Sequence, residues 1–110
     1  MIRFDDYSID DVFEELRRIG QVSSRSKFST YWLGRNESYF RSIQSKGLRA
    51  SVDATVFLLA RLRQLGHSFA RDDDQTIARI GMIYLVLYQK SLDALLTRTH
   101  LDALNWTVNA

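Results

Sequence analysis

Apolar residues recur every three or four positions along most of this chain, a spacing that predicts a succession of amphipathic α-helices. The first predicted helix begins after the N-cap candidate Ser8 and ends at Gly20. Its apolar side carries Val12, Phe13 and Leu16, and charged residues occupy most of its other positions. We therefore expect this helix to be part of the scaffold, with one face in the core.

Two short helices are predicted in the middle of the chain, over residues 27–33 and residues 37–45. Gly34 suits the left-handed turn that follows the first of them. Asn36 is a suitable N-cap for the second, and Gly47 is placed to end it. Two short helices joined in this way are the sequence pattern of a helix-turn-helix core.

A fourth helix is predicted to follow the N-cap Ser51 over residues 52–64, with Gly66 as its stop signal. Apolar residues stand at helical spacing along it and are expected on its core face: Val52, Val56, Leu59 and Leu62. Arg61 and Arg63 are expected on its solvated face.

The last predicted helix is long, because no proline interrupts residues 72–104. The acidic run 72–74 favours a helix start, since carboxylates stabilise the first turn. The half that spans residues 77–88 is apolar on nearly every side, so contacts on one face alone cannot cover it. A second subunit would cover the rest, and the expected dimer-interface residues are Ile77, Ile80, Ile83, Tyr84, Leu87 and Tyr88.

These elements predict an all-α protein: a compact helix-turn-helix bundle of about four helices, followed by a long C-terminal dimerisation helix. The helix-turn-helix unit is placed at residues 1–70 and the oligomerisation segment at residues 71–110, within one compact unit. With 110 residues and 45% hydrophobic content, the chain is long enough to form a single core.

Charge is distributed unevenly along the chain, although the formal net charge is only +2. Residues 24–64 carry eight basic and two acidic side chains, while both flanking parts are net acidic. A basic middle is typical of a binding site for a polyanion such as nucleic acid. A solvated basic surface is the alternative that charge alone leaves open.

Signals for catalysis, cofactors and metals are missing from the sequence. There is no cysteine, no phosphate-binding glycine loop and no nucleophile motif. His67 and His100 are far apart in sequence and lack a ligand motif. The acidic N-terminus lacks the apolar region of a signal peptide. We expect a cytoplasmic protein that is not an enzyme and uses neither a cofactor nor a metal.

The middle of the chain resembles the lambda-repressor-like (Cro/repressor, XRE-type) helix-turn-helix family. The segment LGRNESYFRSI resembles the turn and recognition helix of that family, and ASVDATVFLLARL resembles the helix that follows. The resemblance covers roughly residues 9 to 65 and leaves the C-terminal helix outside. The sequence departs from the family pattern in the helix before the turn, where Ser29 stands at the position of the usual leucine. Thr30 stands near the position of the small residue, often alanine, at which the two helices cross.

The resemblance implies that the helix over residues 37–45 enters the major groove of DNA. The residues placed to contact bases are then Glu37, Ser38, Arg41, Ser42 and Ser45. Arg41 is the strongest single candidate, because arginine reads the O6 and N7 acceptors of guanine. The residues placed to contact phosphates are Ser24, Arg25, Ser26, Lys27, Arg35, Asn36, Lys46 and Arg49.

The sequence therefore favours a small transcriptional regulator, by default a repressor, that binds a palindromic double-stranded DNA operator as a homodimer. The alternative is a protein-interaction antagonist on a helix-turn-helix-like scaffold, such as an anti-activator, an anti-CRISPR-type inhibitor or an antitoxin. In that alternative the helix over residues 72–104 contacts the protein partner.

Overall fold

The computed structural model describes the backbone of residues 7–109 and the side chains of residues 7–99, and every regular element in this part is helical. α1 (Ile9–Arg18), α2 (Arg25–Lys27) and α3 (Tyr39–Ser45) are short, and α2 continues directly into a π-helical turn, η2 (Phe28–Trp32). α4 (Val52–Ala70) and α5 (Gln75–Asn109) are long. The predicted all-α fold with a long C-terminal helix is confirmed.

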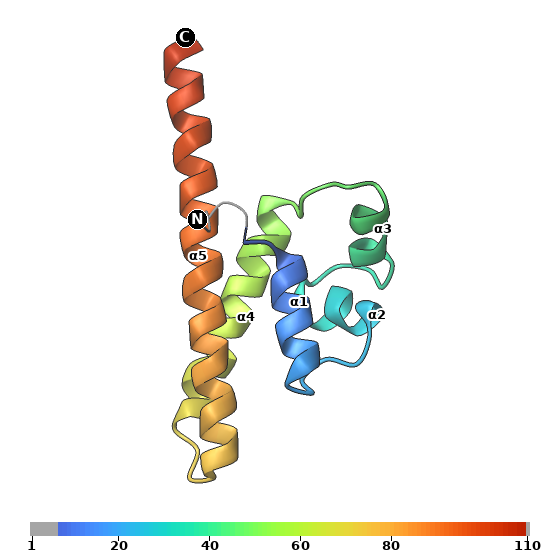
Figure 1. The fold of residues 1–110 in the computed structure, drawn as a ribbon, viewed down its shortest axis with the longest axis vertical. Coiled ribbons are helices and arrows are strands. Elements are labelled where there is room, and N and C mark those ends of the chain that lie inside the picture. Colours follow the sequence, from blue (N-terminus) through green and yellow to red (C-terminus); the bar gives the residue numbers. More distant parts are fainter. Residues whose placement is uncertain (1–6, 110) are drawn as a thin grey trace.

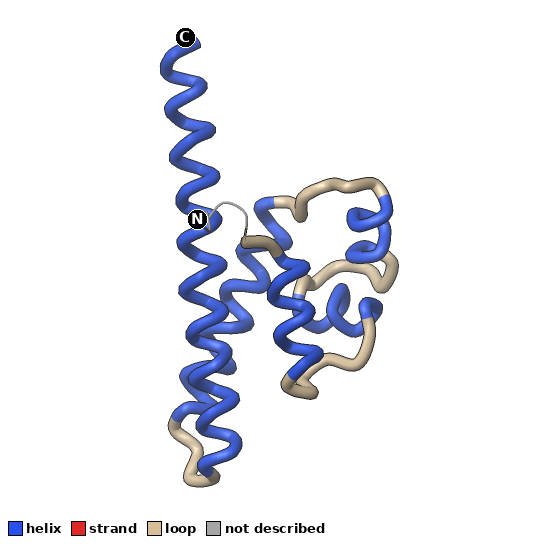
Figure 2. The backbone as a smooth tube through the Cα atoms, in the orientation of Figure 1, coloured by secondary structure: helices blue, strands red, loops and turns tan. Residues whose placement is uncertain are grey.

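α4 and α5 form an antiparallel helical hairpin, and the three short helices pack against one side of it (Figure 1). α5 extends well past the start of α4, so its C-terminal part projects from the rest of the molecule (Figure 1). The loops lie between the short helices and at the tip of the hairpin (Figure 2). The molecule is elongated, with extents of 53 × 27 × 26 Å. No helix in the described part combines the length and apolar character needed to cross a membrane.

The predicted starts of the three longer helices carry capping hydrogen bonds, although at α1 the acceptor is Asp11 and not the predicted cap Ser8. At the start of α1, Asp11 Oδ2 accepts a hydrogen bond from the Ser8 backbone N–H at 2.8 Å. At the start of α4, Ser51 Oγ accepts one from the Ala54 N–H at 3.1 Å. At the start of α5, Asp74 Oδ1 accepts one from the N–H two residues further on, at 2.8 Å. These bonds satisfy donors that would otherwise have no partner at the helix ends.

The core is centred on three phenylalanines, one each from α1, η2 and α3. Phe13, Phe28 and Phe40 are at most 1% exposed. Their ring centroids lie 4.8–5.2 Å apart, with interplanar angles of 53–64°. Such tilted and edge-to-face contacts are favourable for aromatic rings. The cluster holds the three short helices together.

Gly66 does not end α4, contrary to the sequence prediction, because the helix continues to Ala70. Gly66 lies instead where α4 meets α5: an added Cβ would be 2.7 Å from Leu85 Cδ2. An added Cβ on Gly81, opposite it in α5, would overlap the backbone N of Ala70. The two glycines therefore let the helices approach more closely than larger residues would permit.

The core face of α4 also differs from the prediction. Leu59 and Leu62 are buried, but Val52 and Val56 are 50% and 49% exposed. Two overlapping apolar stripes have helical spacing in this segment, and the packing of α5 and of the short helices selects one of them. The buried stripe consists of Ala54, Leu58, Leu59, Leu62 and Gly66.

Two of the six residues that the sequence assigns to a dimer interface are covered by the chain itself. Tyr84 is 2% exposed and Leu87 is 3% exposed. The Tyr84 ring packs edge-on against Trp32, with centroids 5.3 Å apart, and its hydroxyl donates to Gln21 Oε1 at 2.8 Å. Burial raises the pKa of Tyr84 to about 12, so this donor stays protonated at neutral pH. For Tyr84 and Leu87 the dimer-interface prediction is therefore wrong, since packing within the chain already buries them.

The remaining dimer-interface candidates lie at the edge of the core. Ile77, Ile80, Ile83 and Tyr88 are half-buried. Among the described side chains of α5, the large apolar ones most open to solvent are others, namely Met82 at 57%, Val86 at 51% and Leu96 at 57% exposed. The exposed apolar surface of α5 in the described part therefore includes residues that the sequence analysis does not select.

Gly81→Ala is expected to destabilise the protein, because the new methyl group overlaps the α4 backbone at Ala70. Overpacking costs about 1–3 kcal/mol, and the gain in helix propensity offsets at most about 1 kcal/mol of it. Gly66→Ala is the matched comparison, since its nearest contact is the flexible Leu85 side chain. Urea unfolding measures both variants. Equal stabilities, or a Gly81→Ala variant more stable than the parent, would contradict this account of the helix contact.

Candidate nucleic-acid interface

α3 turns one side to the core and the other to solvent. Phe40 is fully buried, and Tyr39 and Ile43 are half-buried against the core. The residues predicted to contact bases are on the remaining side and in the turn just before the helix: Glu37, Ser38, Arg41 and Ser45 are exposed, and Ser42 is half-buried. Helical spacing puts Ser38, Arg41, Ser42 and Ser45 on one polar side of α3, and Glu37 is exposed in the turn before it.

A buried hydrogen bond holds α3 against the preceding helix. Ser29 in η2 is fully buried, and its Oγ accepts a hydrogen bond from the Phe40 N–H at 2.9 Å. This N–H lies in the first turn of α3, where donors have no partner within the helix. Ser29 is therefore the small residue at the crossing of the two helices.

Thr30 is not at this crossing, so the position predicted for the small residue is wrong by one. Thr30 is exposed, and its Oγ1 donates to the Ser26 carbonyl at 3.2 Å. The physical reason is the π-helical turn, in which the Leu33 N–H donates to the Phe28 carbonyl at 3.1 Å. A π-helical turn holds one residue more than the spacing of an α-helix allows for, so it shifts the register of the face.

The turn between η2 and α3 is closed by two local features. Asn36 Oδ1 accepts hydrogen bonds from the Ser38 N–H at 3.1 Å and from the Ser38 hydroxyl at 2.9 Å, so Asn36 organises the start of α3. Gly34 has a φ of +63°, and an added Cβ there would lie 2.7 Å from the Phe57 ring. These bonds use the Asn36 amide oxygen and leave its NH₂ group, the part that can donate to a phosphate oxygen, available.

Five of the predicted phosphate contacts come from α2 with its cap and from the residue directly after α3. Lys27, at the end of α2, and Lys46, directly after α3, are exposed. Arg25 is also exposed, and its Nε donates to Gln44 Oε1 at 2.9 Å, which links α2 to α3. Ser24 caps α2 by accepting from the Lys27 N–H at 3.1 Å. Ser26, also predicted, is half-buried one residue after Arg25.

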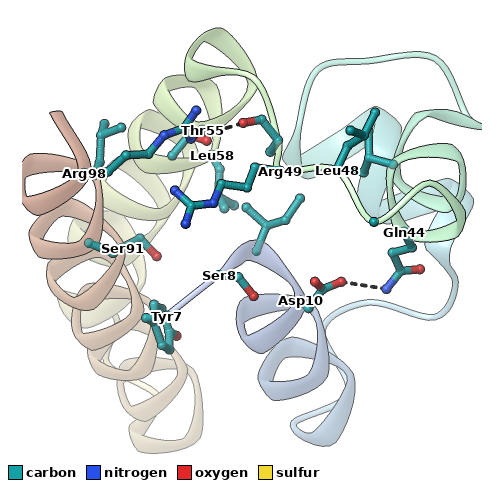
Figure 3. A pocket seen from close by; sticks show the side chains of 16 residues that line it. Tyr7, Ser8, Asp10, Gln44, Leu48, Arg49, Thr55, Leu58, Ser91 and Arg98 are labelled. Atoms are coloured by element: carbon teal, nitrogen blue, oxygen red, sulfur yellow. Dashed lines mark hydrogen bonds between the residues drawn. The ribbon is translucent and has the colours of Figure 1, made fainter. Parts of the chain in front are cut away.

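Two predicted phosphate contacts are directed elsewhere. Arg35 is half-buried, and its Nη2 donates to Ser51 Oγ at 3.2 Å, so it ties the turn to the start of α4. Its guanidinium also lies 5.8 Å from the Tyr39 ring centroid. Arg49 extends into a pocket and toward α5, away from α3 (Figure 3). The structure does not place these two arginines with the others.

Arg61, which the sequence places on a solvated face, is half-buried and packs against two exposed aromatic rings. Its guanidinium lies 4.5 Å from the Tyr31 ring centroid and 5.4 Å from that of Phe57. Its Nε donates to the Tyr31 carbonyl at 3.1 Å. Arg63, in contrast, is exposed. The pairing of Arg61 with Tyr31 joins α4 to η2 and could not be seen from spacing within α4.

Comparison with known proteins gives one match. A model for a family of unknown function, DUF6626, matches residues 9–104. The chain belongs to this family. The DUF6626 match extends from α1 into the last part of α5, so the long helix is part of the family's unit, whereas the helix-turn-helix resemblance ends near residue 65. No curated protein and no solved structure matches the chain.

In the described part of this DUF6626 member, no three His, Cys, Asp or Glu side chains gather where they could hold a metal ion. Of the two histidines, His67 is exposed on α4, and the side chain of His100 lies outside the described residues.

Ser29→Ala is expected to lower the free energy of unfolding by about 1–3 kcal/mol, because it leaves the buried Phe40 N–H without an acceptor. Ser68→Ala is the control, since Ser68 is exposed on α4. Urea unfolding of both variants measures the difference. A loss within about 0.5 kcal/mol of the control would mean that the hydrogen bond contributes little to the position of α3.

Proposed function

We propose that this protein is a small DNA-binding transcriptional regulator that binds a palindromic operator as a homodimer, with α3 in the major groove. One observation carries the proposal: α3 is fixed from the inside by Phe40 and Ser29, while its outer side is polar and open. The order of the helices and the small residue at their crossing support the resemblance to the lambda-repressor-like family. A cytoplasmic location and repression by occlusion of the polymerase are part of the proposal.

The thickness of an α-helix suits the major groove. With its side chains a helix is about 10–12 Å across, and the major groove of B-DNA is about 12 Å wide. Arg41 is exposed on the outer side, and the described residues contribute no hydrogen bond to its guanidinium. It is therefore free to donate to guanine O6 and N7. Glu37, exposed in the turn before α3, would accept from cytosine N4.

Phosphate contacts would fix the register of α3 on the duplex. Lys46 follows α3 directly and Lys27 ends α2, and both are exposed; Arg25 is linked to α3 through Gln44. Such contacts position a protein on DNA but carry no sequence information directly, so specificity is left to the residues of α3.

Homodimer formation is supported by the surface of α5. Met82, Val86 and Leu96 are large apolar residues that are more than half exposed on it. The C-terminal part of the same helix projects beyond the hairpin, where α4 no longer covers it (Figure 1). Pairing of two copies would place two α3 helices for half-sites about 34 Å apart, one turn of DNA.

The same surface of α5 favours a second candidate function, in which the protein is an antagonist that binds another protein. Met82 and Val86 would then contact that partner and not a second copy. The two functions differ in their dependence on salt. DNA affinity falls steeply as salt rises, because each phosphate contact releases counterions, whereas an apolar helix contact changes little.

Selection from a random-sequence duplex pool at about 150 mM salt, followed by sequencing, tests the regulator function. We expect enrichment of a two-fold symmetric motif with half-site centres about 10 base pairs apart. A well-folded protein that enriches no motif would contradict sequence-specific binding and would favour the protein antagonist.

Arg41→Ala is expected to weaken binding to the selected operator by about 1–3 kcal/mol, with a smaller effect on random DNA, because Arg41 is proposed to contact a base. Arg63→Ala is the matched control, since it removes an equally exposed arginine from α4. Titrations of both variants on both DNAs at one salt concentration provide the comparison. An equal loss on operator and random DNA would assign Arg41 to phosphate contact instead.

A further inference from the structure

A pocket of about 470 Å³ lies between the start of α1, the loop that joins α3 to α4, and α5 (Figure 3). Its volume is within the range of small-molecule sites, about 300–1,000 Å³. Its walls come from segments that are far apart in the sequence, around residues 7–10, 43–50, 55–58 and 91–98. The pocket therefore exists only in the folded chain.

Two arginines reach toward this pocket from opposite walls. Arg49 extends from the loop toward α5, and Arg98 extends from α5 toward α4 (Figure 3). Arg98 Nη1 donates to the Ala50 carbonyl at 3.4 Å, which is long for a hydrogen bond. The ion pair found among the described side chains joins Arg18 to Glu15, so within that part neither pocket arginine is paired with a carboxylate.

Asp10 is the acidic residue among those that line the pocket, and it is engaged with α3. Its Oδ1 accepts a hydrogen bond from Gln44 Nε2 at 2.6 Å. Gln44 Oε1 in turn accepts from Arg25 Nε at 2.9 Å. The Asp10 carboxylate thus belongs to a chain of bonds that joins α1, α2 and α3. The pocket keeps an excess of positive charge.

Ser91 supplies a second observation, independent of the arginines. It is 6% exposed, its Oγ has no hydrogen-bond partner, and the hydroxyl points from α5 into the pocket (Figure 3). Buried hydroxyl groups are satisfied in most native structures, so an unpartnered one that faces a cavity indicates a missing acceptor or donor. An oxygen atom of a ligand in the pocket would supply it.

The rest of the lining is largely apolar. Ile43, Leu58 and Leu95 contribute branched aliphatic side chains, and Leu48, which is 59% exposed, stands at the opening. A ligand that fills this space therefore needs an apolar body as well as a charged end. Few, well-placed polar groups in an apolar cavity are the usual composition of a small-molecule site.

We propose that this pocket binds a small organic anion, a carboxylate on an apolar body, with Arg49 and Arg98 around the carboxylate and Ser91 as a hydrogen-bond donor. Arginine suits a carboxylate because its planar fork of N–H donors matches the two oxygens. Bound there, the anion would connect the loop after α3 to α5. This site lies outside the proposed DNA surface and does not depend on the DNA-binding function.

Isothermal titration of the full chain with octanoate tests the site, with 1-octanol and octylamine as neutral and cationic analogues of the same length and with inorganic phosphate as an anion without an apolar body. We expect octanoate to bind with a Kd on the order of 1 mM or lower, and the other three to bind at least about tenfold more weakly. Benzoate is included as an aromatic carboxylate, so that the result does not rest on one body shape. No DNA is present, so the outcome is independent of the regulator proposal.

Variants locate the binding. Arg98→Gln and Arg49→Gln are each expected to weaken octanoate binding by about tenfold or more, since each removes a charge-assisted hydrogen bond. Arg79→Gln is the matched control, because Arg79 is exposed on α5 outside the pocket lining. Ser91→Ala should weaken binding several-fold without lowering the melting temperature of the free protein, because its hydroxyl has no partner there. If Ser91 had only a structural role, the Ser91→Ala replacement would lower the melting temperature.

Four results would overturn the proposal. The first is the absence of measurable binding by either carboxylate, and the second is octanol binding as tightly as octanoate. The third is an equal loss of affinity in Arg79→Gln and Arg98→Gln, which would indicate diffuse attraction to a basic surface. The fourth is binding that occurs only after deletion of residues 1–6, because the chain itself would then be the occupant of the pocket.

Discussion

α3 has only seven residues, and a helix of that length is not stable in water without tertiary contacts. Its place in the molecule therefore depends on the Phe40 ring, which packs between Phe13 and Phe28 with centroids 5.1 and 4.8 Å away. The aromatic cluster determines where α3 lies, but rings that pack edge to face leave some freedom of rotation. The hydrogen bond from the Phe40 N–H to Ser29 Oγ has a direction, so it also determines how α3 is turned. The orientation of Arg41 follows from that bond.

How well the sequence predicts this fold depends on whether each feature is local. Caps such as Ser8 and Ser51 act within one helical turn, so the starts of α1 and α4 follow from neighbouring residues. Gly66 has the same local signature whether it ends a helix or lets another helix approach. What decides between these roles is the contact with Gly81 and Leu85, which lie in the next helix. The sequence therefore predicts that the helix exists and misplaces its end.

The distinction between local and non-local features also holds for the two candidate sites, the polar side of α3 and the pocket. The polar side of α3 follows from spacing within one helix, so its residues can be predicted together. The position of Ser29 at the helix crossing cannot be predicted in this way, because the π-helical turn shifts the register of the helix face. The pocket is still harder to predict from the sequence, since Arg49 and Arg98 come from opposite walls and no motif links them. The one sequence signal is Ser91, which stands one helical turn from Leu87, Ala94 and Leu95 along α5.

Burial and contacts also change what the basic middle of the chain can do. Of its eight basic residues, Arg35 and Arg61 are held by internal contacts, Arg49 faces the pocket, and Arg63 stands on α4. The basic residues that remain around α3 are Arg25, Lys27, Arg41 and Lys46. So small a set can neutralise only a few phosphates, and each contributes a limited, salt-sensitive share of the affinity. A single copy would then bind DNA weakly at physiological salt, whereas two linked copies gain from the high effective concentration of the second site. For the proposed DNA-binding function, the charge around α3 and the exposed apolar side of α5 therefore favour the same arrangement, in which pairing of two chains is a condition for tight binding.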